Sequence, residues 1–286
     1  MNRVSVAALL GALGAAMAAT RADAQCRPPA NSHEARLLAF YESPIVFSMA
    51  GAPERLAAGD LRLGGELVPV PSPDPALQRP NYCYANTMNN TKLAPVFGRP
   101  RLTLGLPAGF AIDASYLPNV TVSSAQASLV SVAVTHTASM PLAGERIALV
   151  VRLDGTGGQV RGAITCPRAS LQTIDESVPC YGTQPSRDTF HPNSFGLELA
   201  AGTRASERVD VYAGGGVRSL RPRFQAGFSD ALGNVDRTTI DVDLVRATAF
   251  AGVTARVRDR IALSGQLYIV PADVTTLRLG AQYTLR

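Results

Sequence analysis

The sequence predicts an all-β fold, an antiparallel up-and-down barrel of about ten strands (range 8–12) that crosses a membrane. Three observations predict it. Apolar and polar residues alternate with a period of two along many segments, short and long connections alternate between those segments, and an export signal precedes them. Beyond that signal no stretch of about 18 apolar residues remains, so only a closed barrel could satisfy its backbone groups in lipid.

Residues 1–24 have the composition of a cleavable signal peptide. Arg3 precedes an apolar run over residues 4–19, and residues 22–24 read Ala-Asp-Ala, a small-residue cleavage site. Cleavage there would leave a mature chain of about 260 residues, which fits one large β domain. Cys26 raises the alternative of a lipoprotein, although the residues before it make a poor lipidation sequence.

The charge pattern argues against a nucleic-acid partner. The chain carries a formal net charge of +5, and nearly all of its cations are arginines, Lys92 being the sole lysine. The arginines are spread along the chain, whereas nucleic-acid binding calls for a basic patch or stripe. Single arginines on alternating strands fit the spread better.

Four cysteines in an exported chain indicate disulfides, because the cell envelope is oxidising. Cys166 and Cys180 lie 14 residues apart in a polar stretch, which predicts a loop disulfide, and Cys26 and Cys83 then pair by elimination. A zinc site is not expected, because there is no Cys-x-x-Cys and the three histidines lie far apart. No cofactor or metal is therefore predicted.

Alternation is clearest at the C-terminus. One side of the last segment is apolar and is formed by Leu277, Leu279, Ala281, Tyr283 and Leu285. The same pattern predicts ten strands, at roughly 60–70, 99–106, 109–117, 126–136, 146–165, 193–202, 206–218, 238–256, 259–270 and 274–286. The strand at 238–256 changes phase near Leu244, which indicates a bulge or an extension beyond the membrane.

The connections fall into two groups. Short ones are expected at 107–108, 137–145, 203–205 and 257–258. Long ones are expected at 71–98, 166–192 and 219–237, with a modest one at 118–125 and a short one at 270–273 on the same side. An even strand count would place both termini on the side of the short turns. Residues 25–59 do not fit the strand pattern and could form a tail or an inward-folded plug, which a Cys26–Cys83 pair favours.

The chain resembles the outer-membrane β-barrel proteins of diderm bacteria. The resemblance covers residues 60–286 and rests on the signal peptide, the hairpin Arg101-Leu-Thr-Leu-Gly-Leu-Pro-Ala-Gly-Phe-Ala-Ile-Asp-Ala-Ser-Tyr116 and the terminal strand. It implies an outer-membrane location with periplasmic termini. It also implies outer-membrane lipid, the barrel-assembly machinery and periplasmic chaperones as partners. In that class the last strand commonly ends in an aromatic residue, whereas here Leu285 takes the final apolar place and Arg286 follows. The resemblance implies an architecture but neither cargo nor oligomeric state.

If the apolar side faces lipid, the other side lines the lumen. The expected lumen-facing residues are Arg62, Glu66, Arg101, Asp113, Arg146, Arg152, Asp154, Glu198, Arg208, Asp210, Arg256, Gln266 and Arg278. A barrel of this size is only slightly wider than its own side chains, so these charges must pair. The sequence therefore predicts an occluded lumen with a structural role, or a narrow porin-like channel for small solutes or a ligand.

Two alternatives remain open. A hydrolase at the outer rim would have to use His191, with Asp188 and Ser194 close by, but a lone loop histidine is usually only solvated, so no enzyme is predicted. A soluble exported β-barrel binding protein is the other alternative, because aromatic girdles are thin. The chain has no tryptophan, and the expected girdle residues are Phe110, Tyr116, Phe195 and Tyr283.

Overall fold

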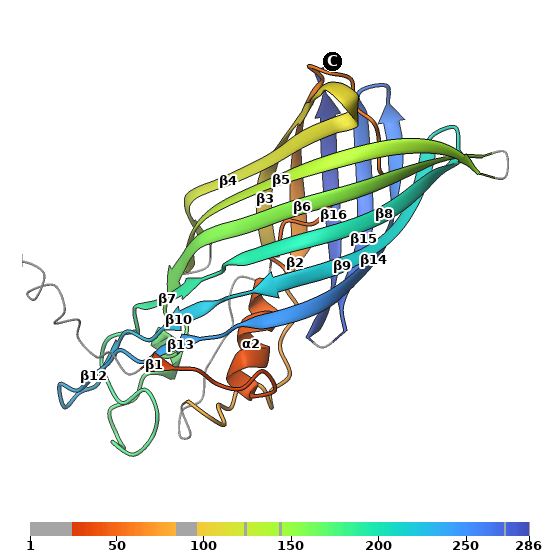
Figure 1. The fold of residues 1–286 in the computed structure, drawn as a ribbon. Helices are drawn as coiled ribbons and strands as arrows, with labels where there is room; N and C mark the ends of the chain where they lie inside the picture. Colours follow the sequence, from red (N-terminus) through yellow and green to blue (C-terminus); the bar gives the residue numbers. More distant parts are fainter. Residues whose placement is uncertain (1–24, 84–95, 123–124, 143–144, 272, 286) are drawn as a thin grey trace, which may run out of the picture.

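In the computed structural model, ten long antiparallel strands close into a barrel (Figure 1). The structure describes residues 25–83, 96–122, 125–142, 145–271 and 273–285; the expected signal peptide, residues 1–24, lies outside them. The barrel strands are β2 (Leu61–Pro69), β3 (Val96–Gly105), β4 (Phe110–Val122), β5 (Ala125–Leu142), β6 (Glu145–Gly162), β8 (Ser194–Ser206), β9 (Val209–Leu220), β14 (Leu244–Arg258), β15 (Ile261–Val270) and β16 (Val274–Thr284).

The barrel is closed by pairing between its first and last strands. Leu67 of β2 lies opposite Leu279 of β16, and every other barrel strand pairs with its neighbours in the chain. β6 pairs directly with β8, which leaves the short strand between them outside the ring. The predicted up-and-down barrel of ten strands is confirmed.

Short strands extend the sheet beyond the far end of β6. They are β7 (Asp188–His191), β10 (Arg223–Gln225), β13 (Thr239–Asp241) and β1 (Gln25–Cys26). Their apolar residues Phe190, Phe224 and Ile240 continue a buried row that begins at Val160. β13 ends just before β14 begins at Leu244, where the sequence changes phase. Two further strands, β11 (Phe228–Ser229) and β12 (Val235–Asp236), form a separate hairpin, and 3-10 turns lie at Pro107–Gly109 and Arg168–Ser170.

The two ends of the barrel differ in their connections. Short turns at 106–109, 207–208 and 259–260 lie at the end where β16 terminates, here called the turn end, and the long connections lie at the other, the loop end. A short connection joins β5 and β6 as predicted, but its predicted bounds, 137–145, were wrong, because β5 runs on to Leu142 and β6 begins at Glu145; their hairpin projects past its neighbours (Figure 1).

The N-terminal segment also departs from the prediction that both termini share one end. β2 does begin at the turn end, but Gln25 pairs with Thr239 at the loop end. The reason is that the intervening residues cross the inside of the barrel. Both predicted disulfides are present: Cys26 bonds Cys83, which fixes the start of the described chain to the connection after β2, and Cys166 bonds Cys180 within the connection after β6.

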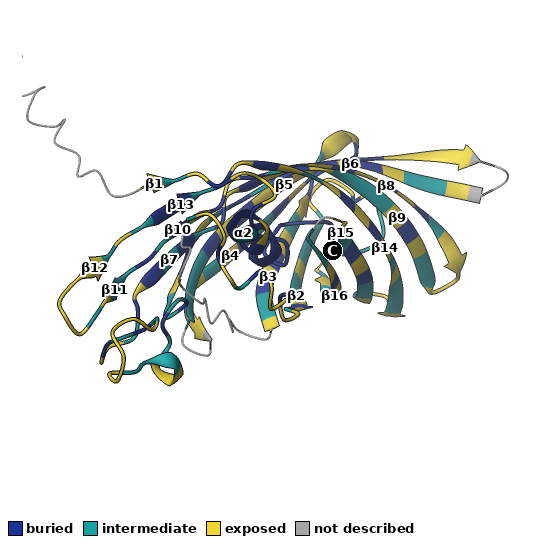
Figure 2. Ribbon diagram, turned by 90° about the horizontal axis from the view of Figure 1, so that it is seen from below, coloured by how far each residue is buried: buried dark blue, intermediate teal, exposed yellow. Residues whose placement is uncertain are grey.

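A helix, α2 (His33–Glu42), occupies the loop end of the barrel and is buried among the strands (Figure 2). Ser32 caps it, because its hydroxyl oxygen accepts a 3.1 Å hydrogen bond from the amide of Ala35. One side of α2 packs on residues inside the barrel, and Phe40 on the other side packs against Leu77 of the loop after β2. Within the described part of the chain, no helix is long and apolar enough to cross a membrane.

The strands are apolar outside and polar inside. Along β8 the exposed residues are Phe195, Leu197 and Leu199, whereas the buried ones between them include Glu198. The same inversion runs around the ring, where leucines and valines are exposed and charged side chains are buried. A barrel that folds in water alone would place these residues the other way round.

Leucines on the two sides of the wall test this arrangement. Leu220 is 1% exposed inside the barrel and Leu267 is 46% exposed outside it. We expect Leu220→Ala to lower the free energy of unfolding by about 2–5 kcal/mol, because it leaves a cavity. Leu267→Ala is the matched control and should have a much smaller effect. Urea unfolding of the detergent-folded protein, followed by circular dichroism, measures both; equal losses would contradict the facing assignment.

Candidate functional site

Residues 43–58, here called the plug, run through the lumen from α2 at the loop end to β2 at the turn end. Because this segment is neither helix nor strand, its backbone carbonyls need partners from the wall. Four buried wall arginines donate to them: Arg99 to Ile45 and Val46 (both 2.7 Å), Arg101 to Ser48 (2.9 Å), Arg152 to Phe47 (3.2 Å), and Arg278 to Ser43 (2.9 Å) and Val46 (3.0 Å). Guanidinium groups suit this task, since each offers five donors in a fixed plane.

The same arginines form ion pairs with two buried carboxylates. Glu66 lies 2.6 Å from Arg101, 3.1 Å from Arg99 and 3.3 Å from Arg278. Asp113 lies 2.5 Å from Arg101 and 3.0 Å from Arg152. Four cations therefore share two anions. The carbonyl oxygens of the plug, which carry partial negative charge, accept the other hydrogen bonds of these arginines. The wall network and the plug complete each other.

Phe47 sits at the centre of this network. Its side chain is fully buried, and its ring centroid lies 4.2 Å from the guanidinium carbon of Arg101, 4.8 Å from that of Arg99 and 5.0 Å from that of Arg152. The negative face of an aromatic ring attracts such cations, most strongly when water is absent. Phe47 therefore anchors the plug by its side chain as the carbonyls do by the backbone.

A second cluster of charged side chains binds the plug at Met49. Arg218 makes two contacts with Asp154, at 2.6 and 3.1 Å, and one with Glu198 at 2.8 Å. The other oxygen of Glu198 accepts a 3.2 Å hydrogen bond from the amide of Met49. Gly196 makes room for this, because a Cβ there would lie 2.7 Å from the Arg218 guanidinium.

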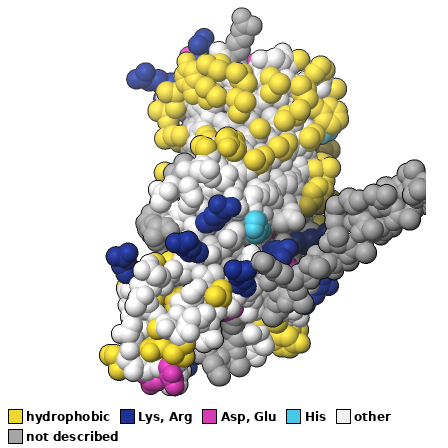
Figure 3. Space-filling model, turned by 90° about the vertical axis from the view of Figure 1, so that its left-hand side faces the viewer, with side chains coloured by type: hydrophobic (Ala, Val, Ile, Leu, Met, Phe, Trp, Pro, Cys, Tyr) yellow, Lys and Arg dark blue, Asp and Glu magenta, His cyan; other side chains and the backbone are white. Residues whose placement is uncertain are grey.

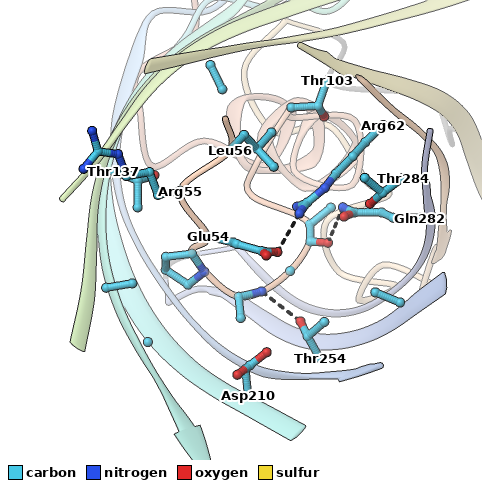
Figure 4. A pocket seen from close by; sticks show the side chains of 18 of the residues that line it. Glu54, Arg55, Leu56, Arg62, Thr103, Thr137, Asp210, Thr254, Gln282 and Thr284 are labelled. Carbon is cyan, nitrogen blue, oxygen red and sulfur yellow. Dashed lines mark hydrogen bonds and ion pairs between the residues drawn. The ribbon is translucent and has the colours of Figure 1, made fainter. Parts of the chain in front are cut away.

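The lumen differs between its two halves. Toward the loop end it is filled by α2, residues 43–49 of the plug and buried wall residues such as Tyr212, Phe250 and Tyr268. The ring centroid of Phe250 lies 6.5 Å from that of Tyr212 and 6.3 Å from that of Tyr268. Toward the turn end lies a cavity of about 800 Å³, here called the vestibule (Figure 4). It reaches from Met49 to the rim at Arg260. The barrel is therefore sealed on one side and hollow on the other.

Residues 50–56, here called the lower plug, cross the vestibule with few hydrogen bonds to the wall. The amide of Ala52 donates to Thr254 at 2.8 Å, the carbonyl of Ala50 accepts from Gln282 at 3.1 Å and from Ser264 at 3.0 Å, and Glu54 lies 2.6 Å from Arg62 (Figure 4). Glu54 is half exposed. Residues 50–56 therefore make fewer hydrogen bonds to buried charged groups of the wall than residues 43–49 do.

Twelve of the thirteen predicted lumen residues lie inside the barrel. Eight are buried: Glu66, Arg101, Asp113, Arg152, Asp154, Glu198, Gln266 and Arg278. Four line the vestibule: Arg62, Arg146, Asp210 and Arg256. The exception is Arg208, an exposed residue of the turn between β8 and β9, because β9 begins at Val209 rather than near residue 206.

Two central residues were missed by the sequence prediction. Arg99 stands at the predicted start of its strand and Arg218 at the predicted end of its own, where boundaries are least certain. The period of two could have found Arg99, since it lies two positions before Arg101 and shares its face. No sequence signal identifies the plug carbonyls as the partners of these arginines.

The candidate hydrolase residues do not assemble into a site. Asp188 is fully engaged by its own loop: its carboxylate accepts hydrogen bonds from Ile164, Thr165, Ser186 and Gly227 at 2.6–2.9 Å. His191 instead contacts the carbonyl of Gly158 at 3.1 Å. The residues described by the structure also include no group of three or more His, Cys, Asp or Glu that could hold a metal ion.

Comparisons with known proteins return only distant matches. No model of a known protein family matches the chain, and no curated protein sequence does. Among solved structures, the chain is similar to Ail, the attachment invasion locus protein of Yersinia pestis (11% identity, TM-score 0.31, 80% of this chain and 100% of that one). It is also similar to the toluene transporter TbuX of Ralstonia pickettii (10% identity, TM-score 0.30, 80% and 89%) and to a loop-deletion mutant of OmpT, an outer membrane protein of Vibrio cholerae (8% identity, TM-score 0.22, 66% and 64%). At these values no residue of this chain takes a role from these proteins.

Glu66 of the wall and Glu54 of the plug both pair with arginines of the wall, which makes them a matched test. Glu66→Gln leaves Arg99, Arg101 and Arg278 buried without their shared anion, so we expect a loss of about 3–5 kcal/mol in the free energy of unfolding. Glu54→Gln removes a partly exposed pair and should cost about 1 kcal/mol or less. Urea unfolding of both variants in detergent measures the difference. A small and equal effect would show that the buried network contributes little.

Proposed function

We propose that the protein is an outer-membrane β-barrel closed by its own N-terminal segment, with a structural role in the envelope rather than open conduction. The observation that carries this proposal is the plug, whose backbone is bound by four buried arginines of the wall. Among the described residues, the plug and α2 pack into the buried core at the loop half of the lumen, which supports a closed barrel.

The outer surface supports a membrane location. An apolar band crosses the barrel wall toward the turn end (Figure 3). The shortest barrel strands have 9 and 10 residues, which matches the length of about 9–11 needed to cross a bilayer. Exposed aromatic residues lie toward both borders of the wall, Phe110 and Tyr283 near the turn end and Tyr116 and Phe195 nearer the loop end. A soluble barrel fits less well, because charged side chains fill its interior while leucines face outward.

Export and assembly complete the proposal. The two disulfides suit an oxidising compartment, which the N-terminal signal sequence would give access to. The outward residues of β16, from Leu277 to Tyr283, are the side that the barrel-assembly machinery would read, with periplasmic chaperones acting before it. The turn end would then face the periplasm, since outer-membrane barrels have their short turns there.

A gated narrow channel is the second candidate function. The observation in its favour is the vestibule, which already opens half of the lumen, together with the weak hold on residues 50–56. In this case part of the plug would have to move for a small solute to pass.

Planar-bilayer recording separates closure from conduction. We expect the wild-type protein to stay silent and a variant lacking residues 27–58 to conduct, because the deletion removes both α2 and the plug. A variant lacking 231–233, at the tip of the β11–β12 connection, is the control and should stay silent. Faster migration of the unboiled deletion variant on a detergent gel would verify that its barrel forms. Steady conduction by the wild-type protein would refute the closed state.

Two substitutions in β16 test the membrane-facing side. Leu279 is exposed outward, whereas Gln282 points inward and donates to the carbonyl of Ala50. Leu279→Arg should block insertion into lipid vesicles, with a penalty of about 2–4 kcal/mol near the bilayer midplane. Gln282→Arg should insert with a milder defect. Equal insertion yields for the two variants would argue against the proposed membrane contact.

A further inference from the structure

We propose that the vestibule binds a small soluble polyanion, a solute with two or more phosphate or carboxylate groups that enters from the turn end. This goes beyond the proposed role as a closed barrel, because a lumen sealed at one end can still take a ligand from the other. The binding requires only the folded barrel and the plug.

The first argument is the charge of the lining. Nine arginines and five carboxylates surround the cavity, a formal excess of four positive charges. Arg62 and Arg256 have carboxylate partners at 2.6 and 2.7 Å. Among the described residues no ion pair joins a carboxylate to four other arginines of the lining, Arg55, Arg146, Arg258 and Arg260, which outnumber the two lining carboxylates without an arginine partner, Asp60 and Asp259. Arg258 and Arg260 stand at the rim, where an incoming anion would meet them first.

The second argument is a set of unused donors deeper in the cavity wall. The Nε atoms of Arg62 and Arg152 and the hydroxyl of Thr203 are buried and have no hydrogen-bond partner among the described atoms. The side chain of Arg152 is only 3% exposed. A buried donor without an acceptor is unfavourable. These atoms lie beneath the cavity surface, so an anion would bind the guanidinium groups after Arg62 or Arg152 turned toward the cavity, where anionic oxygens are the acceptors that such groups prefer.

The third argument is the plug itself, which already places one carboxylate in this lining. Glu54 lies 2.6 Å from Arg62 with its side chain 48% exposed (Figure 4). It is therefore both within reach of the basic lining and accessible to exchange. A bound polyanion would take over Arg62 and release Glu54, which removes one of the few contacts of the lower plug.

The size of the cavity selects the kind of ligand. About 800 Å³ lies within the range of about 300–1,000 Å³ usual for small-molecule sites and far exceeds a single halide. A single ligand that pairs with the rim arginines and Arg62 at the same time needs more than one anionic group. Threonine hydroxyls such as those of Thr103 and Thr137 line the rest and suit a hydroxylated solute.

Calorimetric titration of the full-length, detergent-folded protein with tripolyphosphate tests the site. We expect saturable binding of one ligand per chain that weakens as salt is added, because the attraction is screened. The double variant Arg258→Gln/Arg260→Gln should bind about tenfold or more weakly, since two charged hydrogen bonds are lost. Glu54→Gln should bind more tightly than wild type, because the internal competitor is gone.

Arg161→Gln/Arg187→Gln, two exposed arginines outside the vestibule, is the matched control and should bind as wild type does. The proposal is overturned if the wild-type protein gives no saturable binding, if both double variants lose affinity equally, or if Glu54→Gln weakens binding. Detergent-gel mobility checks the fold of each variant. Because this titration needs no bilayer, its failure is distinguishable from failure of the proposed membrane role, which the conductance and insertion measurements test.

Discussion

The interior depends on one interaction, the sharing of buried arginines between two carboxylates and the carbonyls of the plug. Arg99, Arg101, Arg152 and Arg278 outnumber Glu66 and Asp113, so this cluster alone would hold an excess of buried positive charge. Unpaired buried charge is among the most costly features a fold can contain. An irregular segment with free carbonyls resolves it, and the same bonds satisfy that segment, which has no secondary structure of its own. Wall and plug are each incomplete without the other.

This dependence explains the division of the lumen. Where the plug follows α2, apolar side chains such as Val46 and Met49 belong to the same buried cluster as Tyr212 and Tyr268. Past Met49 the plug leaves the arginine network, the wall carries hydroxyls and exposed arginines, and the vestibule opens. The transition from sealed to hollow therefore coincides with the end of the strong backbone contacts. The barrel therefore has a polar, positively charged chamber at the turn end and a buried, largely apolar core at the loop end.

The sequence could predict the wall but not the contents of the barrel. Strict alternation on segments such as 274–286 reports which side each residue faces, because a strand has a period of two. It located twelve lumen residues and failed for Arg208, where a turn breaks the period, and for Arg99 and Arg218 at strand ends. The plug has no such periodicity. Its position depends on bonds between backbone carbonyls and distant side chains, such as Ser43 with Arg278, which leave no pattern in a single sequence.

The tie between Cys26 and Cys83 has a consequence for how the molecule is put together. One end of the plug is held at the loop end through α2 and this disulfide. The other end continues into β2, which pairs with β16 and closes the barrel. The plug therefore passes through the closed barrel and is attached to the barrel at both ends. The plug can move within the lumen, but it cannot leave through either end of the barrel while the disulfide and the β2–β16 pairing are intact. During assembly, either β2 and β16 pair while the plug already lies between the strands, or the plug enters the closed barrel before the Cys26–Cys83 disulfide forms.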